Sequence, residues 1–316
     1  MKAGHQIELF VHDALTSASA PAFCRTVREA LAAGAARVWL NLEDVKATDV
    51  AGLAAVLQAV RRAESQGVPA AVLPSPAVYR ALLTAGLLDD VPLEGPRAAR
   101  GAVEMPPAPE ARSAAPSWLA RTERLLLRPP AWDELEIFER WAGDPLLDQM
   151  VGSPLLYLCR HVRAHDPDFV ARVLHDATAL TLLVQPAGDG AEPVGFVRLH
   201  NVSVGEGFAF LETAVTGVRG LRAGWGVEAS RLALAYAMDA LEIRRVEAKV
   251  YAYNILSVNA LRRNGFRLEG RLREARTYGG QRWDILVFAI LEGEMRAQRT
   301  RERFPYMGFW PPDARP

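Results

Sequence analysis

A short glycine-containing segment at residues 221–229, LRAGWGVEA, limits the folds open to this chain more than any other segment. It lies between a strand-like apolar run, FAFLETAV, and a helix-like run, RLALAYAM, so Gly224 and Gly226 fall where a strand-to-helix loop meets a helix N-terminus. Glycines there let backbone N–H groups approach an anion that the helix dipole favours. The segment predicts a pyrophosphate-binding loop, although glycine pairs also open many helices for tight turning alone.

The residues after this helix narrow the choice of fold. A strand-like alternation over 244–254, RRVEAKVYAYN, ends at Asn254, and the short helical segment SVNALRRNGF follows with Gly265 at its C-cap. The order of strand, glycine loop, helix, strand, asparagine and short helix resembles the core of the GNAT N-acetyltransferases. That resemblance implies that the loop holds the diphosphate of acetyl-CoA and that Asn254 contacts its pantetheine arm.

Further segments extend the resemblance. Residues 121–129, RTERLLLRP, look like the first strand of the GNAT branch that contains the ribosomal-protein alanine acetyltransferases, and EPVGFVRL resembles its third strand. Residues 269–291 are similar to the closing antiparallel strands of that branch. We therefore expect a GNAT domain over 118–294, with a mixed, mostly antiparallel sheet flanked by helices, and a C-terminal tail over 295–316.

The glycine loop departs from the family pattern at its start. Leu221 stands where the family usually has arginine or glutamine, and Arg222 stands where a second loop glycine often lies. The guanidinium of Arg219 or Arg222 could pair with CoA phosphates and offset this loss; the alternative is weakened or lost cofactor affinity. The residues expected to contact acetyl-CoA lie in the loop, beside it, or at the asparagine: Arg219, Arg222, Ala223, Gly224, Trp225, Gly226, Val227 and Asn254.

Two residues are candidates for the chemistry of acetyl transfer. Glu212, on the strand before the loop, could draw a proton from the amine through a water, or it could be a solvent-facing strand residue. Ser257 could orient the thiolate or a water, although a helix-capping role is the simpler alternative. Many GNATs use a tyrosine to protonate the thiolate, and the matching position here is Leu261. No metal site is expected, because His161, His165 and Cys159 lack further ligands at suitable spacing.

The N-terminal part alternates strand and helix patterns. Helical segments at 20–34, 49–67 and 76–87 separate strand-like runs such as ARVWLNL and VPAAVLP, with Asp49 as a helix N-cap. This order predicts an α/β domain with a central sheet over residues 1–92. The segments RVWLNLEDVKATDVAGLAAVLQAV and SPAVYRALLTAGL make it resemble the STAS domain of anti-sigma-factor antagonists.

The resemblance breaks at the position of the phosphorylated serine in STAS domains. Here the loop reads Asp49, Val50, Ala51, Gly52, and valine has no hydroxyl to phosphorylate. Thr48 could substitute, but it more simply ends a strand. We therefore expect a STAS-like docking, dimerisation or regulatory module without a phospho-switch at this position.

Composition sets the remaining limits. Six prolines fall between Pro92 and Pro116 among many alanines, so residues 93–117 are expected to be a linker. Lysine plus arginine and aspartate plus glutamate both number 37, which disfavours a nucleic-acid or membrane surface. Two cysteines, no apolar run long enough to span a bilayer and no signal-peptide pattern predict a cytoplasmic protein.

These expectations combine into one leading hypothesis and one rival. The leading hypothesis is an acetyl-CoA-dependent N-acetyltransferase that acts on a primary amine, either a protein N-terminus or a small molecule, fused to a STAS-like module that could bind a protein partner or self-associate. The rival is a catalytically degenerate signalling scaffold, or an anti-sigma-factor antagonist-like binding module. Acetyl-CoA binding separates the two.

Overall fold

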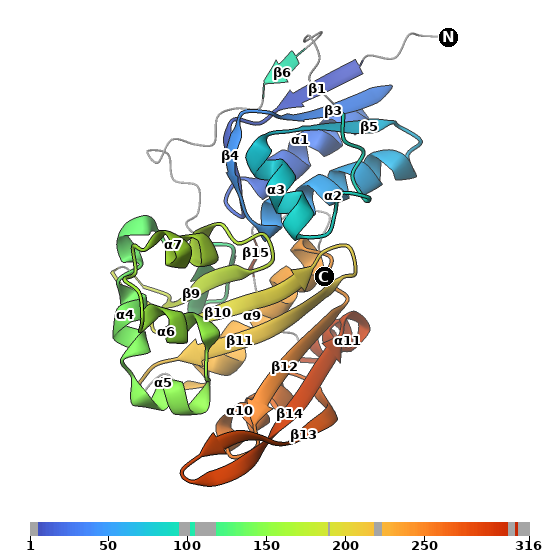
Figure 1. The fold of residues 1–316 in the computed structure, drawn as a ribbon. Helices are drawn as coiled ribbons and strands as arrows, with labels where there is room; N and C mark the ends of the chain where they lie inside the picture. Colours follow the sequence, from blue (N-terminus) through green and yellow to red (C-terminus); the bar gives the residue numbers. More distant parts are fainter. Residues whose placement is uncertain are drawn as a thin grey trace.

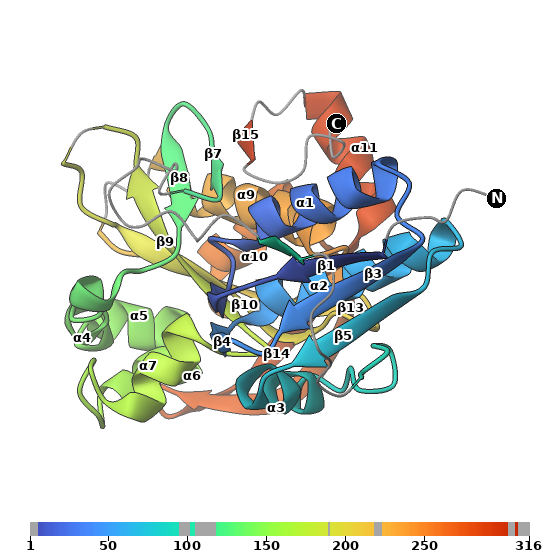
Figure 2. The same cartoon turned by 90° about the horizontal axis from the view of Figure 1, so that it is seen from above.

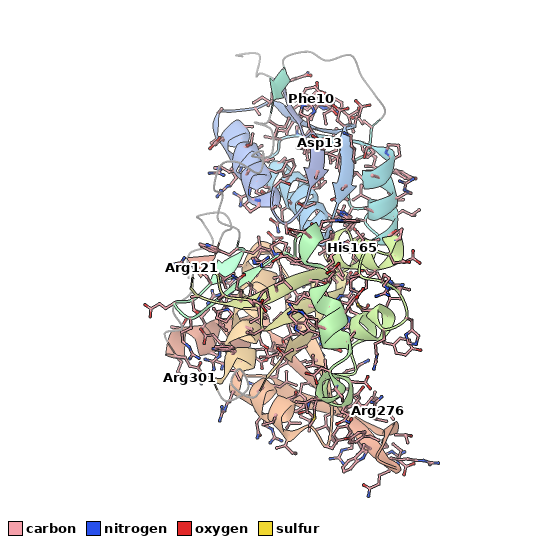
Figure 3. All side chains as sticks on the ribbon, turned by 90° about the vertical axis from the view of Figure 1, so that its left-hand side faces the viewer. Phe10, Asp13, Arg121, His165, Arg276 and Arg301 are labelled. Atoms are coloured by element: carbon pink, nitrogen blue, oxygen red, sulfur yellow. The ribbon has the colours of Figure 1, made fainter. Side chains whose placement is uncertain are left out.

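The computed structural model describes residues 6–94, 102–104, 118–188, 190–217, 223–302 and 307–308. The chain forms two α/β domains that pack on each other, with the N-terminal domain at one end of the molecule and the larger sheet of the C-terminal domain below it (Figures 1 and 2). The hairpin that carries Arg276 projects at the end of the molecule opposite Phe10 and Asp13 of the N-terminal domain (Figure 3). Among the described residues, no helix combines the length and the apolar character that crossing a bilayer requires.

The N-terminal domain is a parallel sheet in the order β5-β3-β1-β6, beside a two-stranded parallel pair, β2 and β4. The helices α1, α2 and α3 alternate with these strands, as the sequence pattern predicts. The elements are β1 Gln6–Phe10, β2 Asp13–Leu15, α1 Ala20–Ala32, β3 Arg37–Leu42, β4 Val45–Thr48, α2 Val50–Ser65, β5 Ala70–Pro74, α3 Pro76–Thr84 and β6 Ala102–Glu104.

The helix ends follow from local chemistry. Asp49 caps α2, because its Oδ1 accepts a hydrogen bond from the Gly52 N–H at 2.9 Å. Gly34 follows α1 with a φ of 81°, a left-handed conformation that favours glycine. Gly52 is also required for packing, because a Cβ there would collide with the Leu15 carbonyl oxygen.

The C-terminal domain is built on a nine-stranded sheet in the order β13-β14-β12-β11-β10-β9-β8-β7-β15. Its described pairings are antiparallel except that between β11 and β12, as expected for the mixed sheet. The strands are β7 Ala120–Arg121, β8 Leu125–Arg128, β9 Leu180–Pro186, β10 Gly195–Ser203, β11 Phe208–Val215, β12 Arg245–Tyr251, β13 Arg267–Tyr278, β14 Gln281–Leu291 and β15 Met307–Gly308.

Helices cover both faces of this sheet (Figure 1). A layer of short helices covers one face, where Phe138, Phe169 and Phe196 form an aromatic core. The helices are α4 Ile137–Ala142, α5 Pro145–Met150, α6 Pro154–Cys159, α7 Pro167–Leu174, α9 Trp225–Ala240, α10 Ile255–Arg263 and α11 Glu292–Glu302. Of these, α9 and α10 pack on the opposite face, which carries Thr213 of β11.

Two expected boundaries differ from the structure. The segment expected as a linker over 93–117 contains β6, which pairs in parallel with β1. The tail expected from 295 onward begins inside α11, a helix whose Met295 is buried and whose Arg299 guanidinium lies 2.9 Å from the Asp239 carboxylate. Buried pairing of this kind fixes α11 to the domain, so packed structure continues past residue 294.

The two domains share one apolar core. A single cluster of buried side chains runs from the N-terminal sheet through α2 into α9 and the C-terminal sheet. Polar bonds reinforce the contact: the Val50 N–H donates to the Asp176 carbonyl at 3.1 Å, and Gln58 Nε2 donates to the Ala240 carbonyl at 2.9 Å. Val50 is therefore fully buried, and α2 serves both domains at once.

This shared core predicts that the two domains unfold together. In calorimetry the full chain should show one cooperative unfolding transition. Gly52→Ala forces a Cβ against the Leu15 carbonyl, so it should lower the free energy of unfolding of the whole chain by about 1–3 kcal/mol. Gly143→Ala is the control, because its Cβ would meet only ordinary contacts at 3.6 Å. Two transitions, with only one of them lowered by Gly52→Ala, would show that the domains are independent.

Candidate functional site

The central feature of the C-terminal sheet is a gap between β11 and β12. These strands pair only where Phe208–Phe210 meets Arg245–Glu247, and β11 then continues to Val215 without β12 beside it. The pairing of β10 with β11 is irregular between His200 and Ser203, where Asn201 has a φ of 47°, and it is regular from Phe210 to Val215 of β11. The open side of β11 is therefore the side toward β12.

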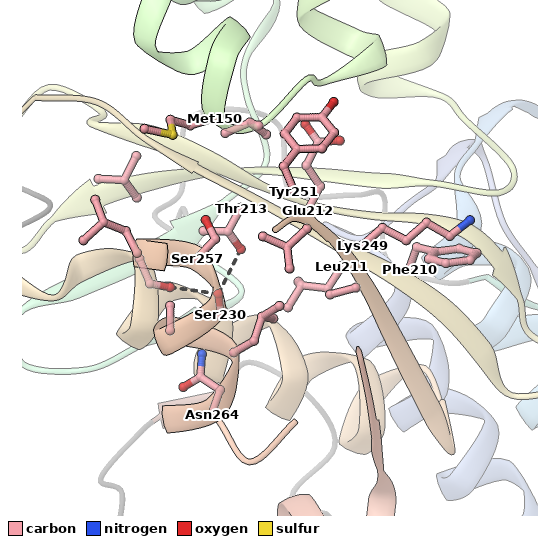
Figure 4. Close-up of a pocket in the computed structure, with 18 of the residues that line it drawn as sticks. Met150, Phe210, Leu211, Glu212, Thr213, Ser230, Lys249, Tyr251, Ser257 and Asn264 are labelled. Carbon is pink, nitrogen blue, oxygen red and sulfur yellow. Dashed lines mark hydrogen bonds between the residues drawn. The ribbon is translucent and has the colours of Figure 1, made fainter. Parts of the chain in front are cut away.

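A cavity of about 520 Å³ passes through this gap (Figure 4). We call the part at the N-terminus of α9 the loop end, and it is lined by Gly224, Gly226 and Arg263. The part on the other face of the sheet is the far end, and it is lined by His200, Phe210, Glu212, Lys249 and Tyr251. One continuous space thus joins the two faces of the sheet.

The glycine loop leaves room at the loop end. Gly224 is the N-cap of α9 and has a φ of 75°, and a Cβ added there would meet nothing within 4 Å. A Cβ on Gly226 would meet only Val215 Cγ2, at 3.7 Å. Since the first N–H groups of a helix have no partner within the helix, this open turn can receive an anion.

Basic side chains surround the loop end, and the sequence prediction missed them. Arg124 donates to the Ala223 carbonyl at 2.7 Å, and Arg263, in the last turn of α10, lines the cavity beside Gly224. The RRNG sequence after Asn254 was a signal for Arg263, because it ends the short helix beside the loop. The expected contacts Arg219 and Arg222 lie outside the described residues.

Glu212 lies on the far side of the gap from the glycine loop. Thr213 faces α9, where its Oγ1 lies 2.9 Å from Ser230 Oγ, so alternation along β11 turns Glu212 to the opposite face. Figure 4 shows Glu212 beneath Tyr251 and apart from Thr213 and Ser230. Its Oε1 is buried and has no hydrogen-bond partner within the described part of the chain. Glu212 is therefore half-buried, with one carboxylate oxygen shielded from solvent.

The surroundings of Glu212 set its acidity. Burial raises the pKa of its carboxyl above the ordinary 4.5, while a hydrogen bond from Ser153 and the charge of Arg198 oppose this shift. Arg198 pairs directly across from Glu212 in the sheet and is itself held by Asp176, with 3.3 Å between Nη2 and Oδ2. Burial and then the nearby Arg198 lower the pKa of His200 to about 4, so His200 is neutral near pH 7.

Asn254 and Ser257 lie at the start of α10. Asn254 is buried and caps this helix, with Oδ1 accepting from the Ser257 N–H, while its Nδ2 donates to the Met150 carbonyl at 2.9 Å and to Ser257 Oγ at 2.8 Å. The side chain of Asn254 is thus fully used within the protein, and it ties α10 to the end of α5. Ser257 lines the cavity and Asn254 does not.

The remaining expectations concern Leu261 and metals. Leu261 is nearly buried and lines the cavity, so no phenol is present at this point of α10. His165 Nε2 lies 3.0 Å from the Trp132 carbonyl oxygen, and no group of three His, Cys, Asp or Glu side chains among the described residues could hold a metal ion.

Family models match both parts of the chain. Residues 2–94 match a model described as "Mlab, STAS domain", and residues 124–267 match a model described as "Acetyltransferase (GNAT) domain". The second match covers the glycine loop, the gap and α10. The C-terminal domain is a GNAT acetyltransferase domain. It is an N-acetyltransferase of the kind that uses acetyl-CoA, and its specific branch within the GNAT family stays a prediction.

Solved structures similar to this GNAT domain include three named acetyltransferases. A GCN5-related N-acetyltransferase from Brucella melitensis is 19% identical over 60% of this chain and 85% of its own, with a TM-score of 0.47. Spermidine N-acetyltransferase from Vibrio cholerae, in complex with CoA and spermine, is 18% identical over 55% and 99%, with a TM-score of 0.43. RimJ from Mycobacterium smegmatis, in complex with CoA-disulfide, is 22% identical over 57% and 89%, with a TM-score of 0.44.

The bonds of Asn254 predict a structural effect. Asn254→Asp keeps the helix cap but removes the donor to the Met150 carbonyl, so it should destabilise the protein by about 1–3 kcal/mol. Asn259→Asp makes the same change at an exposed position of the same helix and should stay within about 0.5 kcal/mol. Urea denaturation of both variants measures this difference, and equal stability of the two would contradict the assigned bonds.

Proposed function

We propose that this protein transfers the acetyl group of acetyl-CoA to a primary amine that enters the cavity from the far end. The observation that carries the proposal is the cavity through the sheet, with an open helix N-terminus at one end and, at the other, a carboxylate whose Oε1 is buried and has no hydrogen-bond partner among the described residues. These two ends match the needs of a bound phosphate and of an amine that must lose a proton.

The loop end has the groups to hold the cofactor. Backbone N–H groups of the turn at Ala223, Gly224, Trp225 and Gly226 would bind the diphosphate, because a Cβ added on Gly224 would meet nothing within 4 Å. The Val227 N–H already donates to the Gly224 carbonyl. Arg263 and Arg124 would add charge-assisted bonds to phosphate oxygens, and Arg219 and Arg222 remain candidates for the same role. In this proposal Asn254 acts by fixing α10 rather than by contacting the pantetheine arm.

The far end has the groups for the chemistry. Glu212 takes one proton from the incoming ammonium, directly or through a water, and the free amine forms an N–C bond to the acetyl carbon as the C–S bond breaks. The nitrogen then loses a second proton, which passes through water to Ser257 and replaces the proton that the thiolate takes up. Ser257 Oγ accepts a bond from Asn254, which leaves its own proton free for the departing thiolate. Backbone N–H groups of β11 on the side without β12 would bind the thioester oxygen.

The N-terminal domain would act in cis in this proposal. The position of the STAS phosphoserine, Val50, is buried and its N–H is bonded to Asp176 of the GNAT domain, so the surface around it is already occupied. Such a domain would stabilise and position the transferase rather than respond to a kinase at that site. The rival function, a scaffold without catalysis, predicts no acetyl-CoA binding.

Cofactor binding at the glycine turn can be tested without loss of folding. Gly226→Ala adds a methyl group that the protein can accommodate and that improves helix propensity, so stability should stay equal or rise by up to about 1 kcal/mol. The same methyl group crowds the N–H groups of the turn, so the affinity for acetyl-CoA, measured by calorimetry, should fall about tenfold or more.

The control for this variant is Gly293→Ala. Gly293 lies in α11, and a Cβ there would meet nothing within 4 Å, so the change has the same helix propensity without reaching the cavity. The affinity of Gly293→Ala for acetyl-CoA should equal that of the wild type. Tight binding by Gly226→Ala, or no binding by the wild type, would contradict the proposed function.

The role of Glu212 predicts the pH dependence of the reaction. The reaction needs Glu212 in its deprotonated form, so kcat/KM should be at its maximum when the pH is above the pKa of Glu212. It should fall as the pH drops through that pKa, which burial raises above the ordinary 4.5 of a glutamate. Glu212→Gln should lower kcat/KM by about 10²-fold or more and should remove this acidic limb. Glu206→Gln, at an exposed turn, is the control, and an unchanged limb in Glu212→Gln would assign it to another group.

A further inference from the structure

The charges at the far end of the cavity differ from those that a polycationic acceptor requires. Glu212 is the only carboxylate among the described residues that line the cavity, and Lys249 adds a positive charge at the same end. His200 is neutral near pH 7 because burial lowers its pKa to about 4. The other lining cation, Arg263, lies at the loop end. The lining of the far end therefore carries one anion and one cation, and a further cation, Arg276, lies beside it with its Cζ 4.6 Å from the centroid of the Tyr251 ring.

Lys249 is oriented toward this end by its neighbours. Its Nζ lies 5.0 Å from the centroid of the Phe210 ring, and the rings of Phe210 and His200 stack at 5.4 Å (Figure 4). No carboxylate among the described residues forms an ion pair with Lys249, since the nearby Glu247 pairs with Arg245. The ammonium is exposed, so it is open to an anion that arrives from solvent.

The spacing between Lys249 and Glu212 follows from the strands. Phe210 and Glu212 are two residues apart on the same face of β11, which separates them by about 7 Å. Tyr251 shares its face of β12 with Lys249 and lies against Gly152, where a Cβ would collide with the tyrosine hydroxyl. An acceptor amine at Glu212 would thus be separated from an anion at Lys249 by a short stretch lined with aromatic rings.

We propose that the acceptor is a small primary amine that also carries an anionic group, a carboxylate or a phosphate, and that Lys249 binds this group. The inference rests on the proposed function, because it assumes that the amine reacts at Glu212. It names a specificity residue rather than a catalytic one: Lys249 selects the acceptor, and Glu212 takes its proton. A polyamine would bring a second cation to Lys249 and would be rejected.

Acceptor pairs that differ only in the anion test this proposal. The pairs are 4-aminobutyrate with butylamine, and O-phosphoethanolamine with ethanolamine; spermidine and a peptide with a neutral side chain at its N-terminus complete the panel. The wild-type full chain should acetylate the anionic member of at least one pair with kcat/KM about tenfold or more above its neutral partner. The pair that shows the preference separates carboxylate from phosphate recognition.

Variants of Lys249 assign the preference to this side chain. Lys249→Met should remove the difference in kcat/KM between the two members of a pair, because it raises the KM of the anionic acceptor and leaves the KM of acetyl-CoA unchanged. Lys249→Glu should favour spermidine. Lys46→Met is the matched control, because Lys46 pairs with Asp13 on the surface of the N-terminal domain and should leave the preference intact.

The outcomes separate this inference from the proposed function. Calorimetry of acetyl-CoA is run on every variant, and absence of binding by the wild type overturns the proposed function itself. If acetyl-CoA binds, then equal or better use of butylamine, spermidine or the neutral peptide overturns the inference. A preference that survives Lys249→Met, or acetylation of none of the anionic amines, overturns it as well.

Discussion

The separation of β11 from β12 is the constraint on which the rest of the C-terminal domain depends. Three paired residues hold the two strands together, and beyond Phe210 each strand has backbone groups that its neighbour does not cover. A sheet can keep such a gap only when other elements hold its two halves, and here β10 pairs with β11 while β14 pairs with β12 along its whole length. The cavity is thus a consequence of strand pairing. Its two ends differ because successive side chains of β11 point to opposite faces of the sheet, Thr213 to one and Glu212 to the other.

The N-terminal domain adds a second constraint from outside the sheet. Helix α2 is buried on both sides, and its first N–H bonds to the carbonyl of Asp176, whose carboxylate holds Arg198 opposite Glu212. A short chain of contacts therefore connects the N-terminal domain with Arg198, whose charge opposes the rise that burial causes in the pKa of Glu212. The N-terminal domain thus packs through α2 against the GNAT domain of the same polypeptide.

Patterns within short segments allowed the helix starts and the glycine turn to be predicted from the sequence. The Asp49 cap, the glycine turn at Gly224 and the helix after Asn254 each depend on residues a few positions apart, and each lies where expected. The burial of Glu212, the approach of Arg263 and the engagement of Asn254 with Met150 depend on residues that are far apart in the sequence. The packing of α11 against the domain has a weak signal in the sequence, because this helix is polar in composition and packs through few buried residues.

A crystal structure of the full chain with acetyl-CoA tests the central claim most directly. The account predicts the diphosphate at the N–H groups of Gly224 to Gly226 and the pantetheine arm between β11 and β12. It places the thioester carbonyl within reach of β11 backbone N–H groups, on the side where Glu212 opens to the cavity. Acetyl-CoA bound elsewhere, or a gap closed by pairing of β11 with β12 in the complex, would contradict it.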